Sequence, residues 1–328
     1  MRKSVVESYP QLWHYTTASG LWGIITSQQL WATNISYLND GEELTGFFDR
    51  KLLHLLEEGA REGVVESRTT PQDLRFLEAA GGQVIVENVF PKELLAILRS
   101  VTLRLQVYVA SFCYTPPGSD SEDGLLSQWR GYGSDGGYAI VFETQGLDEL
   151  LRDEQRRFLY SYGHWGDVDY YDGDAGAGAA HEETLEWEAT IRKTVASIVC
   201  EQNLHPAEAL FVPILSLSTR HKHRGFREES EVRIAVVTSD DELMREARKA
   251  CDNRPEKPVH FTLRGGILVP HIALFERPAG EKAMLPIRKI IVGPHPEKLK
   301  RQKAVEILLD QCGIEAEVVA SDIPYLGH

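Results

Sequence analysis

Two side chains near the N-terminus, His14 and Thr16, have the spacing of neighbours on one face of an extended strand. A ring nitrogen and a hydroxyl on the same face can hold one polar ligand between them. The structural alternative is a half-buried histidine beside the start of a helix, because Thr17 or Ser19 would cap a helix over residues 20–27.

Two carboxylates, Glu229 and Glu231, alternate at the start of an apolar run that predicts a buried strand, so they share one face. Such a pair is costly to bury unless it is solvated, paired or used. One interpretation is a strand entrance that Arg227 and Arg233 neutralise by ion pairs. The other is a carboxylate held against a positive charge that develops during a reaction.

A basic run, residues 220–227, precedes these carboxylates. It contains four Lys or Arg, among them Arg224 and Arg227, with two His and no acid. In a chain of net charge −14 this contrast indicates an anion site, such as one for phosphate, or else a solvated loop. The neighbouring cations argue against metal binding by His221 and His223, and we expect no metal.

An aromatic pair, Trp129 and Tyr132, lies three residues apart in a predicted short helix, residues 125–132. This spacing offers a platform for a flat ring or simply packs in the core. Nearby glycines match the letters of a dinucleotide-binding loop, but they precede a strand instead of linking a strand to a helix. A Rossmann site is therefore not predicted.

The elements that must position these side chains are strands and helices mixed without regular alternation, which predicts an α+β fold around a mixed or antiparallel sheet. We expect a single domain over residues 1–328. Residues 42–106 are rich in helical pattern and predict a helical insertion or cap on the sheet. Residues 164–180 are acidic and glycine-rich and predict a mobile loop.

The composition of the chain argues against several classes of protein. The 328 residues contain 35 Lys or Arg and 49 Asp or Glu, which argues against a protein that coats DNA without specificity. No apolar run is long enough for a secretory signal or a membrane span, so we expect no membrane association. The four cysteines are scattered and form no CxxC pair, which favours a reducing cytoplasm.

Taken together, several segments resemble the bacterial family known as domain of unknown function 2971. The resemblance spans nearly the whole chain in the expected order. The matching segments are residues 12–16 (LWHYT), 30–33 (LWAT), 38–43 (LNDGEE), 110–112 (ASF), 127–133 (SQWRGYG) with Gly136 and Gly137, 226–233 (FREESEVR), 291–294 (IVGP) and 321–325 (SDIPY).

The chain is also similar, more distantly, to the histidine-type ADP-ribosyltransferase superfold. Members of that branch open with a strand that ends in His-x-Thr or His-x-Ser, which His14 and Thr16 match. A late strand brings a glutamate to the ribose, and Glu231 is the best match for it. The spacing of Glu229 and Glu231 also looks like the paired acidic motif of other branches.

This second resemblance implies NAD as the substrate and assigns roles to the residues. Glu231 would stabilise the oxocarbenium-like transition state of nicotinamide–ribose cleavage, His14 would hold a neighbouring hydroxyl, and Thr16 would assist the nicotinamide end. Tyr15, Tyr37 and Tyr132 compete for the ring that stacks on nicotinamide, with Trp129 as a further platform. Arg224 and Arg227 would meet the pyrophosphate or an anionic acceptor.

The function that the resemblance implies is transfer of ADP-ribose from NAD to a macromolecular acceptor, protein or nucleic acid, in a toxin or antiphage effector with an antitoxin or other partner protein. Three alternatives stay open. They are a nucleotide-binding or sensing module without turnover, an NAD glycohydrolase, and a nucleic-acid binder that uses residues 220–227. The sensing module would have a pocket in which His14 and Glu231 do not converge.

Overall fold

The computed structural model describes residues 4–38, 43–67, 83–115, 123–132, 136–171, 181–239, 252–277 and 284–324. The helices in these ranges are α1 (Val5–Ser8), α2 (Ala18–Ser27), α3 (Glu43–Gly46), α4 (Leu53–Ser67), α6 (Gln83–Asn88), α7 (Phe90–Leu103), α8 (Leu126–Tyr132), α9 (Thr144–Arg157), α10 (Glu182–Glu201), α11 (Phe211–Arg220) and α13 (Lys298–Cys312). Shorter turns are the 3-10 helices η1 (Ile35–Tyr37), η3 (His205–Leu210) and η4 (Arg224–Glu229), and the π-helical turn η2 (Phe47–Leu52).

The described strands are distributed along the whole chain. They are β1 (Gln11–Thr16), β2 (Leu30–Asn34), β3 (Leu105–Cys113), β4 (Tyr138–Glu143), β5 (Tyr162–Asp167), β6 (Asp169–Tyr171), β7 (His221–His223), β8 (Glu231–Ser239), β9 (Val259–Arg264), β10 (Ile267–Leu274), β11 (Ile287–Val292) and β12 (Glu317–Ala320).

Ten of the described strands form one open sheet, which follows the order β12-β11-β4-β1-β3-β2-β10-β9, with β8 paired to β3 and β5 paired to β8. Within it β11 and β12 are parallel and the other pairs are antiparallel. The strands β6 and β7 form a separate parallel pair. The α+β class with a mixed, largely antiparallel sheet is therefore confirmed.

One face of the sheet carries the main apolar core. Leu21, Ile24 and Ile25 of α2 pack there, together with residues of α9 and α13. Thr17 caps α2 by accepting a hydrogen bond from the N–H of Gly20 at 3.2 Å, so of the two predicted caps it is Thr17 that acts. The other face packs against α8 and α11.

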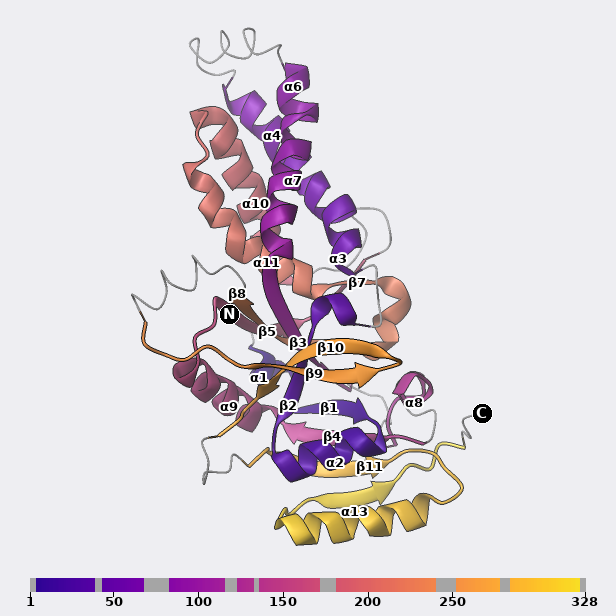
Figure 1. The fold of residues 1–328 in the computed structure, drawn as a ribbon. Helices are drawn as coiled ribbons and strands as arrows, with labels where there is room; N and C mark the ends of the chain where they lie inside the picture. The colour runs from indigo at the N-terminus through magenta and orange to yellow at the C-terminus, as the bar shows by residue number, and fades with distance from the viewer. Residues whose placement is uncertain are drawn as a thin grey trace.

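A helical layer stands at one end of the sheet, at the top of Figure 1. It joins α4 and α7, from the predicted insertion, to α10 and α11, and its core contains Phe47, Leu56 and Ile191. Residues 43–67 and 83–103 are helical as predicted, and β3 begins at Leu105. The rest of the predicted insertion, residues 42 and 68–82, lies outside the described residues.

The predicted mobile loop over residues 164–180 is wrong in its first part, because residues 164–167 belong to β5 and residues 169–171 to β6. Pairing with β8 overrides the polar, glycine-containing sequence, since the ladder runs from Tyr162 opposite Val237 to Asp167 opposite Val232. Residues 172–180 lie outside the described residues.

Candidate functional site

Glu231 begins β8 at the centre of a buried ion-pair network. Only 3% of its surface is exposed. The Arg233 Nε lies 2.7 Å from its Oε1, and the Lys222 Nζ lies 2.8 Å from its Oε2. The same Lys222 Nζ lies 2.7 Å from Oε2 of Glu229, and Arg233 also donates to the carbonyl oxygen of Thr219 at 3.0 Å. Both oxygens of Glu231 are thus occupied by cations.

The pKa values of the two acids in this network are shifted in opposite directions. Burial by itself would raise the pKa of Glu231, but the charges of Arg233 and Lys222 outweigh it and lower that pKa to about 2. Burial raises the pKa of Glu229, and Lys222 offsets only part of that effect. Glu231 is therefore an ionised, paired carboxylate near neutral pH, as in the salt-bridged interpretation, except that Lys222 and not Arg227 is the second cation.

His14 lies on the opposite face of the sheet. Trp13 of β1 stands opposite Cys113 of β3, and Cys113 stands opposite Glu231 of β8, so these three side chains share one face. His14, one position further along β1, points to the other face, where its ring lies 5.8 Å from that of Phe112. The structure therefore does not bring His14 and Glu231 into one groove.

The contacts of His14 are those of a core histidine. Its Nδ1 lies 3.0 Å from the carbonyl oxygen of Ser111. Burial lowers the pKa of His14, and the hydrogen bond to Ser111 opposes this effect only in part. Thr16, at the end of β1, shares the face of His14.

Tyr15 and Trp129 do meet, but inside the core on the face of Glu231. The Tyr15 ring meets that of Trp129 edge-on at 4.9 Å. The hydroxyl oxygen of Tyr15 accepts a hydrogen bond from the N–H of Leu125 at 2.8 Å, and the Trp129 Nε1 donates to the carbonyl oxygen of Asp123 at 3.0 Å. Both rings are buried and their polar atoms are bonded, so both serve as packing here.

The other predicted site residues lie on separate elements. Tyr37 in η1 is exposed, and its carbonyl oxygen lies 3.5 Å from Arg264 Nη1 of β9. Tyr132 is the last residue of α8. Arg224 and Arg227 are exposed in η4, next to the half-buried Glu229. The basic run is thus partly buried at Arg220 and Lys222 and partly solvated.

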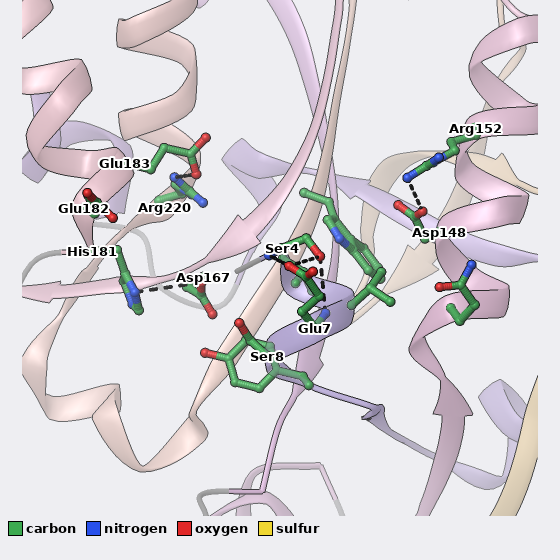
Figure 2. Close-up of a pocket in the computed structure, with 15 residues that line it drawn as sticks. Ser4, Glu7, Ser8, Asp148, Arg152, Asp167, His181, Glu182, Glu183 and Arg220 are labelled. Atoms are coloured by element: carbon green, nitrogen blue, oxygen red, sulfur yellow. Dashed lines mark hydrogen bonds and ion pairs between the residues drawn. The ribbon is translucent and has the colours of Figure 1, made fainter. Parts of the chain in front are cut away.

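A cavity of about 770 Å³ lies elsewhere, without His14 in its wall. Figure 2 shows Ser4, Glu7 and Ser8 of the N-terminal segment between α9 on one side and β5, α10 and α11 on the other. The lining residues are Ser4, Val5, Val6, Glu7, Ser8, Tyr9, Gln145, Asp148, Arg152, Trp165, Asp167, His181, Glu182, Glu183 and Arg220.

The C-terminal end of β5 forms one wall of the cavity. Trp165 and Asp167 are two positions apart and share one face, opposite Ile234 and Val232 of β8. Between them Gly166 leaves room for the guanidinium of Arg220, since a Cβ on Gly166 would lie only 2.5 Å from Arg220 Cζ. The absence of a side chain at position 166 is therefore required for this placement of Arg220.

The remaining walls carry ion pairs. Arg152 Nη2 lies 2.8 Å from Asp148 Oδ2 on α9, and Arg220 Nη1 lies 2.6 Å from Glu183 Oε2 on α10 (Figure 2). The ring of His181, the cap residue of α10, lies 3.8 Å from Asp167 Oδ2. Five carboxylates and two arginines line the cavity, a formal charge of −3 with His181 neutral.

Buried polar atoms of this wall lack a hydrogen-bond partner in the described part of the chain. Among the described residues neither Asp167 Oδ1 nor Arg220 Nε has a hydrogen-bond partner, although both atoms are buried. Only 3% of the surface of Arg220 is exposed. Burial, and then the neighbouring Asp167, raise the pKa of Tyr9, whose ring stacks on Tyr114 at 4.2 Å. The Asp167 acceptor and the Arg220 donor thus have no polar partner among the described residues, and they lie on the two faces of β5.

Sequence reasoning missed this cavity because its residues come from five separate segments. Two local signals were present. Gln145, Asp148 and Arg152 have the spacing of one helix face, and Trp165 and Asp167 have that of one strand face. Neither signal indicates which other segment these side chains face. Only the packing of α1, α9, β5 and α10 brings them together.

No group of three or more His, Cys, Asp or Glu in the described ranges has the geometry to hold a metal ion. Within the same ranges, no helix has both the length and the apolar character that crossing a membrane requires.

Comparison with known proteins gave one match. Neither the curated proteins nor the solved structures contain a significant match to this chain. A family model described as "Protein of unknown function (DUF2971)" matches residues 128–234, from α8 to β8, and so includes Trp129, Arg220, Glu229 and Glu231. Residues 128–234 of this chain are thus similar to the DUF2971 family, and the predicted resemblance is matched over that range.

Proposed function

We propose that this chain is a nucleotide-binding or sensing module without turnover, and that the cavity lined by Asp167 and Arg220 receives the ligand. The observation that carries the proposal is the pair of buried, unpartnered atoms, Asp167 Oδ1 and Arg220 Nε, on the wall of a cavity of about 770 Å³. A buried polar atom without a partner in the described protein indicates a bound polar group. The size suits a small organic ligand.

The lining suits the parts of a nucleoside. Carboxylates such as Asp167 accept hydrogen bonds from ribose hydroxyls and exocyclic amines. The rings of Trp165 and Tyr9 offer apolar surface to a base. Arg220 and Arg152 can donate to a phosphate, as arginine does in many anion sites.

The formal charge of the cavity limits the ligand further. Each arginine already pairs with an acid, Arg152 with Asp148 and Arg220 with Glu183. A wall with a net charge of −3 repels a triphosphate more than it repels a nucleoside or a ligand with one or two phosphates. We therefore expect adenosine, AMP, ADP-ribose or NAD to bind better than ATP.

Binding without turnover follows from the placement of the predicted catalytic pair. His14 and Glu231 point to opposite faces of the sheet. Glu231 is buried and bonded to two cations, so it has no free oxygen to offer a ribose. Neither residue lines the cavity.

The test is a binding titration of the full chain with adenosine, AMP, ADP-ribose, NAD and ATP, together with an assay for free nicotinamide. We expect saturable binding of at least one of the first four ligands and no nicotinamide release. Asp167→Asn should weaken binding at least tenfold, because it removes the charge that faces the ligand. The control Asp310→Asn changes an exposed carboxylate on α13 and should bind like wild type.

Two results would overturn the proposal. If none of the five ligands binds at millimolar concentration, the cavity is not a nucleotide site. If nicotinamide is released from NAD and Glu231→Gln stops the release, the chain is an enzyme of the predicted ADP-ribosyltransferase type. A labelled macromolecular acceptor would then separate transfer from NAD hydrolysis.

A further inference from the structure

The hairpin β9–β10 exposes an apolar surface at one edge of the sheet. On β9 the residues Val259, Phe261 and Leu263 alternate with polar residues, and they are 41%, 62% and 73% exposed. Leu268 of β10 stands opposite Leu263 and is 61% exposed. These four side chains share one face because their positions have the same parity in the ladder.

The strand that carries this surface is also an open edge. β9 is the last strand on the path of the sheet, and in the described part of the chain it pairs only with β10. An exposed edge strand with apolar side chains readily accepts another strand. Strands β9 and β10 are the orange hairpin in Figure 1, and neither contributes a residue to the lining of the cavity in Figure 2.

We propose that β9 pairs with β9 of a second copy of this chain, antiparallel and across a two-fold axis at Phe261. With the axis perpendicular to the sheet, Phe261 stands opposite Phe261, and Val259 stands opposite Leu263. His260 then faces Thr262 on the other side. Every apolar side chain of β9 thus meets an apolar side chain, and this self-complementary order is why a second copy is the occupant.

Pro270 fits this register. It stands opposite Phe261 in the ladder between β9 and β10. Because proline has no N–H, the position opposite it is favoured as a non-hydrogen-bonded pair. The N–H and carbonyl of Phe261 then turn toward the open edge, where two copies of Phe261 exchange both hydrogen bonds at the axis.

The exposed apolar surface of the hairpin is small, and its area determines how tightly two copies can associate. A side chain of this size carries on the order of 150 Å², so the four exposed fractions leave roughly 350 Å² per protomer. With a ladder of six residues this lies at the lower edge of specific interfaces. We expect a weak dimer that forms as the concentration rises.

Sedimentation of the full chain from about 1 to about 200 µM tests the dimer, since an interface of this size associates in that range. Wild type should shift from monomer to dimer. Phe261→Asp should stay monomeric, because it places two like charges on the axis. The control Leu299→Asp replaces a side chain on α13 that is also 73% exposed and should dimerise like wild type.

Cysteine cross-linking tests the register. Two copies of a cysteine at position 261 would have Cα atoms about 5.5 Å apart, which suits a disulfide. Two copies at position 263 would be roughly 14 Å apart, because each stands opposite position 259. Phe261→Cys should therefore form a disulfide-linked dimer on mild oxidation, and Leu263→Cys should not, with wild type as the background for the native cysteines.

Three results would overturn the proposal. If wild type remains a monomer at every concentration, β9 does not pair with a second copy of this chain. A dimer that persists in a folded Phe261→Asp variant forms elsewhere. Cross-linking of Leu263→Cys as fast as that of Phe261→Cys contradicts the axis at Phe261.

Discussion

At the scale of single residues, the partner of a charge decides its role. Glu231 was predicted either to hold a ribose or to neutralise arginines, and its two oxygens lie 2.7 Å from Arg233 and 2.8 Å from Lys222. The burial of all three charges makes the network sensitive to the loss of one member.

Glu231→Gln should destabilise the protein by about 3–5 kcal/mol, because it leaves the buried Arg233 without its carboxylate and leaves Lys222 paired with Glu229 alone. Urea unfolding followed by circular dichroism measures this. The control Glu228→Gln, an exposed neighbour, should change the free energy of unfolding by no more than about 0.5 kcal/mol. Equal stabilities for the two variants would show that the network contributes nothing.

The pH dependence of stability is set by a single buried residue, His221. Burial, then Lys51 and Arg50, lower the pKa of His221 to about 3, from an ordinary value of 6.5. The folded state therefore holds His221 neutral, and the stability this gives is complete above pH 6.5 and is lost as the pH falls toward 3. Between pH 7 and pH 5 the loss is about 2 kcal/mol.

His221→Phe should remove that loss between pH 7 and pH 5, because the new ring still stacks on Tyr171, 3.7 Å from the present one, but cannot take a proton. Urea titrations at the two pH values measure the difference. His54→Gln on α4 is the control and should keep the wild-type pH dependence. If His221→Phe loses as much stability between pH 7 and pH 5 as wild type does, another group causes the acid sensitivity.

At the scale of elements, two glycines let α4 and α10 pack closely. A Cβ on Gly59 would lie 2.6 Å from the carbonyl oxygen of Arg192, and one on Gly63 would lie 2.8 Å from that of Ala196. Glycine weakens a helix, so its presence at positions 59 and 63, one turn apart, reflects this close approach.

Gly63→Ala should destabilise the helical layer by about 1–3 kcal/mol, since overpacking against backbone atoms outweighs the gain in helix propensity. Gly23→Ala on α2 is the matched control. A Cβ there meets nothing within 4 Å, so this variant should be about 0.5–1 kcal/mol more stable than wild type. Thermal unfolding of both variants decides, and a stabilised Gly63→Ala would contradict the packing.

At the scale of the whole molecule, the excess of acids opposes compaction. With 35 basic and 49 acidic residues the folded chain repels itself, and salt screens exposed charges more than buried pairs such as Glu231 and Arg233. Raising NaCl from about 10 to about 150 mM should therefore increase the melting temperature by roughly 2 °C, which corresponds to about 1 kcal/mol. A fall in the melting temperature would mean that surface ion pairs dominate instead.

The sequence by itself determined the α+β class, the helix that follows β1, the helices on either side of β3 and the similarity to DUF2971 over residues 128–234. Such features depend on local spacing, which a single chain displays directly. Only the tertiary structure decided that His14 and Glu231 face apart, and that Asp167 and Arg220 share a cavity. The reason is that side chains alternate along a strand, so the register between strands distant in sequence selects the face, and a shift of one residue reverses it.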